Sequence, residues 1–246
     1  MTEFQKPNRE AVDPNPETRT LVQFSVFGLV MDGDGSILLL NQNAQDPSLP
    51  TQRSWRTPGG KVETTDTIDD GSNDILSGAE KPKNQTSNDF VRLIKPEKAD
   101  EFVATCIPMM DINFLANQCR RELTEEFNKA ICRDITSDKA LRAQLIAAKD
   151  PRLVAETDFI IETHTPWIKA VARDPNDNVN LQRMYFTVNL SDEAIQKVIQ
   201  LVTNNQALWY NGMQTNINNM PVSDGSKRSQ ELSTLEDIFT PVEHES

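Results

Sequence analysis

The stretch that decides the fold is Arg121-Glu122-Leu123-Thr124-Glu125-Glu126, which carries three glutamates within six residues. On an α-helix, residues spaced i, i+3 and i+4 lie on one face, so Glu122, Glu125 and Glu126 are predicted to project together. Carboxylates at this spacing repel one another unless a cation neutralises them. A hard divalent cation bound through oxygen ligands would do so, and a solvated acidic helix face is the alternative interpretation.

The residues around this stretch predict a helix from Asp111 to about Ile131. Asp111 is a residue type that accepts hydrogen bonds from the first turn of a helix. Apolar residues recur at helical spacing and provide a face for packing. They are Phe114, Leu115, Cys119, Leu123 and Phe127.

Upstream, the sequence predicts a β-hairpin. Residues 21–31 read LVQFSVFGLVM, residues 32–35 read DGDG, and residues 36–40 read SILLL. Two apolar runs across an Asp/Gly turn are typical of two paired strands. Downstream, residues 184–190 are expected to form a strand, and Ser191 to cap a helix through about Ala207. Strands and helices mix without strict alternation, which predicts an α/β (α+β) sandwich.

Polar stretches divide the chain. We expect residues 1–20 to be a flexible lead-in, and residues 21–246 to form a single domain. Two insertions are expected in that domain, at about 67–110 and 191–225. The first is polar and aperiodic, with short ordered segments predicted near Phe90–Ile94 and Glu97–Val103.

Composition narrows the class of protein. The net charge of −12 argues against a long nucleic acid as partner. No apolar run is long enough to span a bilayer, so no membrane partner is expected. Three cysteines, Cys106, Cys119 and Cys132, form no CxxC pair and predict no disulfide framework. A reduced, cytoplasmic protein is the resulting expectation.

Gly59-Gly60-Lys61-Val62-Glu63, taken together with Arg121-Glu122-Leu123-Thr124-Glu125-Glu126, resembles the Nudix box. The pattern of that family is a glycine, five residues, a glutamate, seven residues, then Arg-Glu-apolar-x-Glu-Glu-x-Gly-apolar. The resemblance covers the chain from about Leu21 to Ile131. It implies a mixed β-sheet packed between helices, and hydrolysis of a phosphoanhydride bond with Mg²⁺ or Mn²⁺.

The resemblance also implies roles for individual residues. Glu122, Glu125 and Glu126 would bind the metal, and Glu125 or Glu126 would help to activate water. The carbonyl of Gly59 would be a further metal ligand, and Gly60 would permit a close turn. Arg121 would pair with a carboxylate in the loop and orient the helix.

The chain departs from the family pattern at three points. Asp66 stands where the pattern has its first glutamate, so Arg121 could instead pair with Glu63 or Asp111. Between Asp66 and Arg121 lie 54 residues, where the pattern has seven. Asn128 replaces the glycine, a mild change because asparagine tolerates the left-handed conformation that ends helices.

Three further residues complete the predicted site. A late loop is expected to supply another metal ligand, with Glu231 the first choice and Asp224 the second. Arg56 could meet substrate phosphates, and Trp55 could stack on a base.

The resulting hypothesis is a pyrophosphohydrolase acting on a small nucleoside diphosphate derivative, with a homodimer possible. One alternative is a catalytically weak nucleotide-binding or regulatory module of the same fold. A second is an isomerase of an isoprenoid diphosphate, which would need an acid–base pair and commonly a cysteine. The only cysteine of the first insertion is Cys106.

Overall fold

The computed structural model describes residues 19–41, 55–63, 79–80, 82, 88–163, 166–172 and 179–210. Within residues 166–172, the side chains of residues 167 and 169–172 are outside this description. Of the expected lead-in at residues 1–20, residues 1–18 also lie outside it, as do Asp66, Asp224 and Glu231.

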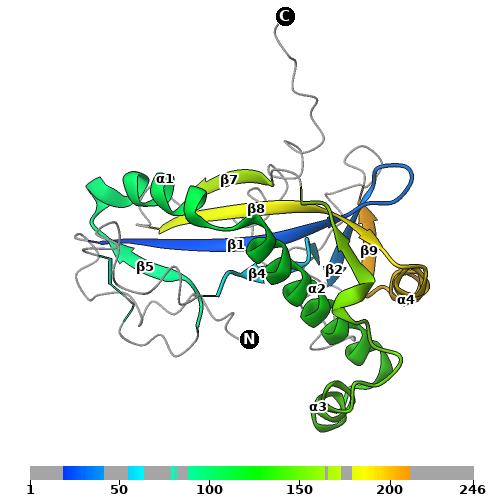
Figure 1. Cartoon of the computed structure of the whole chain (residues 1–246). Coiled ribbons are helices and arrows are strands. Elements are labelled where there is room, and N and C mark those ends of the chain that lie inside the picture. Colours follow the sequence, from blue (N-terminus) through cyan, green and yellow to red (C-terminus); the bar gives the residue numbers. More distant parts are fainter. Residues whose placement is uncertain are drawn as a thin grey trace, which may run out of the picture. The chain divides into compact units, whose positions relative to one another are not determined.

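The described ranges contain both helices and strands (Figure 1). The strands are β1 (Thr20–Val30), β2 (Ile37–Asn41), β3 (Trp55–Arg56), β4 (Gly59–Lys61), β5 (Val91–Ile94), β6 (Phe159–Ile161), β7 (Trp167–Ala172), β8 (Val179–Leu190) and β9 (Ala207–Tyr210). The helices are α1 (Ala99–Met109), α2 (Ile112–Ile135), α3 (Lys139–Ala147) and α4 (Asp192–Thr203), with short 3-10 turns η5 (Pro96–Lys98) and η6 (Glu156–Asp158).

These strands form two sheets. In the larger sheet the order is β4-β1-β8-β6, with β5 paired to β1 and β7 paired to β8. The smaller sheet is antiparallel, in the order β3-β2-β9. Helices pack against the sheets, which confirms the prediction of a mixed α/β fold. No helix in the described ranges is long and apolar enough to cross a membrane.

The predicted hairpin is wrong in its pairing. Its turn forms, because Asp32 Oδ1 accepts hydrogen bonds from the backbone N–H groups of Asp34 (3.0 Å) and Ser36 (2.8 Å). Beyond it, a single bridge joins Met31 to Ile37, and β2 then enters the smaller sheet. All five residues of β2 are buried. A strand buried throughout needs partners on both edges, and β3 and β9 provide them.

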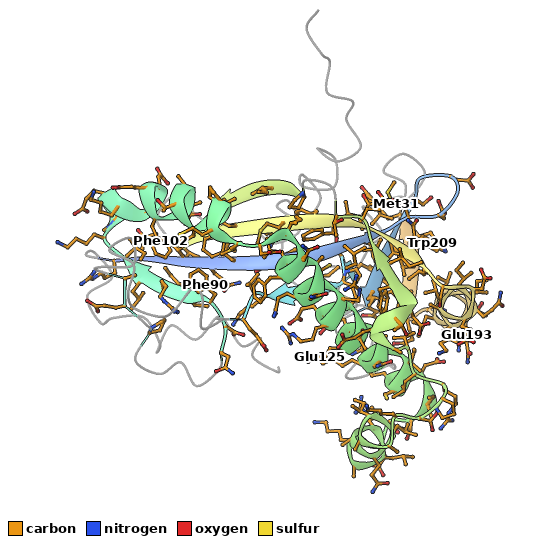
Figure 2. The ribbon with its side chains drawn as sticks, viewed as in Figure 1. Met31, Phe90, Phe102, Glu125, Glu193 and Trp209 are labelled. Atoms are coloured by element: carbon orange, nitrogen blue, oxygen red, sulfur yellow. The ribbon has the colours of Figure 1, made fainter. Side chains whose placement is uncertain are left out.

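The chain divides into two compact units, and β1, α2 and β8 each contribute residues to both. The first unit holds residues 1–26, 60–118 and 167–184. In it, β5 pairs antiparallel with the start of β1. The ring of Phe90 lies 5.3 Å from that of Phe24 and 6.4 Å from that of Phe102, which comes from α1 (Figure 2). The ordered segments predicted in the first insertion are therefore confirmed, and their aromatic cluster includes Phe24 of β1.

The second unit holds residues 27–59, 119–166 and 185–246. Ser191 caps α4 as expected, because its hydroxyl accepts a hydrogen bond from the backbone N–H of Ala194. This helix is shorter than predicted: it ends at Thr203, and Ala207 begins β9. Asn205 has a φ of 57°, a left-handed conformation that helices commonly use to stop.

Candidate active site

Helix α2 begins where the sequence predicts and runs further. Asp111 Oδ1 accepts hydrogen bonds from the backbone N–H groups of Asn113 (2.6 Å) and Phe114 (3.2 Å). The helix continues past the predicted end at Ile131 to Ile135. It buries one face completely, because the side chains of Cys119, Leu123, Phe127 and Ala130 are all 0% exposed.

Asn128 does not end the helix, so the interpretation of this residue as a helix-stopping substitute for glycine is wrong. It lies within α2, and its side chain pairs with the backbone of Val154. Asn128 Nδ2 donates to the Val154 carbonyl at 3.0 Å, and its Oδ1 accepts from the Val154 N–H at 2.8 Å. An amide side chain offers one donor and one acceptor, so it can hold an extended segment as a neighbouring strand would.

The three glutamates of α2 differ in their exposure to solvent. The side chain of Glu122 is 12% exposed and that of Glu126 is 15%, whereas that of Glu125 is 48% exposed. Burial raises the pKa of Glu122 above its usual value, and repulsion from Glu125 and Glu126 adds to this effect. The charge on Arg121 opposes it. The acidic face is therefore partly desolvated, and its charge is costly without a cation.

Two basic side chains of the same helix pair with these carboxylates. Arg121 Nη2 lies 2.6 Å from Glu122 Oε1, and Arg121 Nη1 lies 3.8 Å from Glu125 Oε2. Lys129 Nζ lies 2.7 Å from Glu125 Oε1 and 2.9 Å from Glu126 Oε1. These pairs supply the neutralising charge. The pairing of Arg121 with a loop carboxylate stays a prediction.

Gly28, in β1, connects the glycine loop to helix α2. Its backbone N–H donates to the carbonyl of Pro58 at 3.0 Å, immediately before Gly59. A Cβ atom at position 28 would lie 2.7 and 2.9 Å from the two terminal methyl groups of Leu123, and 3.0 Å from a methyl of Val188. Only a residue without a side chain fits this approach. Pro58 and Leu123, far apart in sequence, thus contact the same glycine.

Sequence reasoning missed Gly28, although one signal was present. A glycine inside an apolar strand often marks a close approach of another backbone or side chain. In the loop itself, Gly59 has a φ of 156°, a conformation that favours glycine, and Gly60 is not among the glycines with positive φ. The unusual backbone therefore lies at Gly59 and not at Gly60, where we had expected the close turn.

Trp55 and Arg56 form β3, immediately before this loop, and are half-buried. Trp55 packs against the buried cluster formed by Leu29, Ile37, Leu39, Tyr185 and Tyr210. This packing places part of the indole in the core. A role for Trp55 or Arg56 in substrate binding stays a prediction.

The carboxylates of α2 suit a hard cation in chemical type, since carboxylate oxygens are the ligands that Mg²⁺ and Mn²⁺ prefer. Glu125 and Glu126 also hold one cationic group in common, the ammonium of Lys129. Across the described ranges, however, no three histidine, cysteine, aspartate or glutamate side chains gather into a group that could hold a metal ion. A complete set of ligands would need further groups, and both candidates in the late loop lie outside the described residues.

The cysteines do not favour the isomerase alternative. All three are free and buried. Cys106, in α1, is 3% exposed, and burial raises the pKa of its thiol to about 11. A thiol in this state is a poor proton donor or acceptor for an exposed diphosphate substrate.

Comparison of the chain with protein-family models, curated proteins and solved structures found no match. The resemblance to the Nudix box therefore depends on the residues of the two motif halves alone.

Proposed function

We propose that this chain is a Nudix-type pyrophosphohydrolase, which cleaves a nucleoside diphosphate linked to another group by attack of water on phosphorus. One observation carries the proposal. The Pro58–Gly59 loop is hydrogen-bonded to Gly28, and Leu123 packs on that same residue. Leu123 directly follows Glu122, so one residue of the acidic hexapeptide and the residue before Gly59 both contact Gly28. Packing of this kind holds the helix in place, and catalysis requires that reacting groups be held in a fixed geometry.

In this proposal the residues of α2 have distinct roles. Glu122, Glu125 and Glu126, together with the Gly59 carbonyl and Glu231, would hold Mg²⁺ or Mn²⁺. When bound, the ion would lower the pKa of the attacking water and polarise the phosphoryl oxygens.

The remaining roles are proton transfer, orientation of Glu122 and substrate binding, and protein side chains perform them. Glu125 or Glu126 accepts the proton of the water, since a carboxylate within hydrogen-bond reach of a water molecule can act as a general base. Arg121 keeps Glu122 oriented through the ion pair of 2.6 Å. Arg56 binds the substrate phosphates and Trp55 the base.

The proposal includes a small nucleotide derivative as substrate, a cytoplasmic location and a possible homodimer. A net charge of −12 supports a small substrate over a long nucleic acid. Three free, buried cysteines support a reducing compartment.

A second candidate function has its own support. In a catalytically weak binding or regulatory module, Arg121 and Lys129 would neutralise the carboxylates permanently. Their ion pairs with Glu122, Glu125 and Glu126 favour this alternative. It predicts nucleotide binding without formation of a metal-dependent product.

The test is product release from a panel of nucleoside diphosphate derivatives with Mg²⁺ or Mn²⁺. We expect turnover by the natural chain, its loss with a chelator, and a decrease of about 10²–10⁴-fold in Glu125→Gln or Glu126→Gln. Glu193→Gln is the matched control, because Glu193 is an exposed glutamate on α4 (Figure 2). Binding of nucleotide to the folded chain with no product from any member of the panel would favour the regulatory module.

A further inference from the structure

The apolar surface of helix α4 is wider than the part that the fold buries. Ala194, Val198 and Leu201 are each 1% exposed and form the buried face. Ile195 and Ile199, each one position further along the chain, are 40% and 51% exposed. The two isoleucines are spaced i, i+4, so they form one ridge beside the buried face. A surface helix normally presents polar residues on the side away from its core, so this ridge predicts a partner.

The ridge of Ile195 and Ile199 differs from the other exposed apolar residues of the described ranges. Those are Met31, Met109, Leu141, Ile146, Ile160 and Ile168. Leu141 and Ile146 share helix α3 but are five residues apart, which places them on different ridges. Single exposed apolar residues are normal on a protein surface, whereas neighbouring ones indicate a contact.

The charges of α4 favour one kind of partner. Asp192 and Glu193 lie in its first turn. Beyond them every exposed residue of the helix is uncharged, and these are Ile195, Gln196, Ile199, Gln200 and Thr203. A basic partner would be drawn to acidic surfaces instead. Copies of a chain with a net charge of −12 repel one another, and this repulsion is weakest where the contacting surfaces carry no charge. The ridge therefore suits a second copy of this chain.

An antiparallel pairing of two α4 helices agrees with these features. The midpoint between Ile195 and Ile199 is position 197, close to the centre of a helix that runs from Asp192 to Thr203. A two-fold axis at this level places Ile195 of each copy beside Ile199 of the other. It also separates the two acidic first turns by the length of the helix, about 18 Å. A parallel pairing would instead bring these turns together, where their charges repel.

We propose that this chain forms a two-fold homodimer through the ridge of α4, with Ile195 of each copy packed against Ile199 of the other. One helix from each copy provides less than the area of about 1,200–2,000 Å² that stable interfaces bury, so a weak dimer is expected, with a Kd in the micromolar range. The inference does not depend on metal binding at α2. It assigns a surface to the homodimer that the proposed function includes.

The experiment is sedimentation of the full chain over a range of concentrations, at low and at moderate salt. We expect a monomer–dimer equilibrium that becomes tighter as salt is raised, because salt screens the repulsion between two acidic copies. A contact made by ion pairs would become weaker instead.

Substitutions on the ridge test the surface itself. Ile199→Glu should abolish the dimer, because it places a carboxylate against an apolar side chain of the second copy. Ile199→Gln adds no charge and should weaken the dimer roughly tenfold, since the lost apolar contact occurs twice in a two-fold dimer. Ile146→Glu is the matched control, because it adds the same charge at an isoleucine of α3 that is 46% exposed. This control should form the dimer as the natural chain does.

A mixture of two variants tests the antiparallel arrangement. Ile199→Glu and Ile195→Lys should each be monomeric alone, because each places an unpaired charge against an apolar side chain. Mixed together they should associate, since position 199 of one copy lies beside position 195 of the other and the two new charges are opposite. Failure of the mixture to associate would contradict this arrangement.

The remaining outcomes overturn the inference. A natural chain that is monomeric at every concentration would exclude a second copy as the partner of the ridge. A dimer that persists in Ile199→Glu would use another surface. If Ile199→Glu instead lowers the melting temperature of a monomeric chain more than Ile146→Glu does, another segment of the same chain covers the ridge. None of these results affects the proposed hydrolase, because product release from the nucleotide panel tests it separately.

Discussion

The two faces of α2 are held by different forces. On one face, Cys119, Leu123, Phe127 and Ala130 are completely buried. On the other, the glutamates are 12–48% exposed and are held by ion pairs within the helix. Burial of apolar side chains is stable against changes of ions in solution, whereas exposed ion pairs are screened and exchangeable. One helix thus combines a buried apolar support with an acidic surface whose ion pairs can exchange.

The largest effect is expected from Gly28→Ala, which disturbs the packing of the buried apolar face of α2. The new methyl group would lie 2.7 Å from a terminal methyl of Leu123, a side chain that is 0% exposed and has no room to move away. We expect a loss of about 2–3 kcal/mol in the free energy of unfolding, measured by denaturant titration. Gly33→Ala is the control, since nothing lies within 4 Å of its Cβ position, and a change under about 0.5 kcal/mol is expected.

A double-mutant cycle assigns this effect to one contact. In the Gly28→Ala background, Leu123→Ala should lower the free energy of unfolding by less than it does in the natural chain. The reason is that replacing the leucine also removes its clash with the new methyl group at position 28. Equal costs in both backgrounds would show that Leu123 is not the residue in the way.

A smaller effect is expected from Asn128→Ala, which tests a residue of α2 held by hydrogen bonds and not by apolar burial. The variant loses both hydrogen bonds to the backbone of Val154, a residue that is 5% exposed. We expect a loss of about 1–2 kcal/mol in the free energy of unfolding, because a buried N–H is left without its acceptor. In Asn204→Ala, which removes an exposed hydrogen bond to Asp134, the loss should be under about 0.5 kcal/mol. Similar losses in the two variants would argue against a stabilising role for the hydrogen bonds between Asn128 and Val154.

The smallest effect is expected from Glu122→Gln, which tests the acidic face of α2. Burial raises the pKa of Glu122 in the folded protein from its ordinary value of 4.5. A raised pKa means that the folded state holds this proton more tightly, so stability is lost as pH rises through that pKa. In the metal-free protein, Glu122→Gln should therefore unfold at a higher denaturant concentration than the natural chain at pH 7. The two should converge near pH 4.

The control for this comparison is Glu125→Gln, at a position that is 48% exposed, where surface ion pairs contribute little to stability. A lower stability of Glu122→Gln at pH 7 would mean that the ion pair with Arg121 outweighs the cost of burial.

Much of the local structure could be predicted from the sequence. The cap at Asp111, the apolar face of α2 and the cap at Ser191 all follow from spacing and residue type within one or two turns. The common face of Glu122, Glu125 and Glu126 follows from the same helix geometry. The end of α4 was missed, because the left-handed Asn205 that stops it carries no signal stronger than the apolar pattern that continues through Ala207.

The sequence by itself determined which residues share a face of α2 and that residues 21–30, 37–40 and 184–190 form strands, because these properties depend on periods of a few residues. Only the tertiary structure decided that β2 leaves β1 for β3 and β9, and that Gly28 receives both Leu123 and the Pro58–Gly59 loop. It also decided that Asn128 holds Val154. The physical reason is that these contacts join residues far apart in the chain. Their partners are selected by shape and by unsatisfied hydrogen-bonding groups, which no local pattern records.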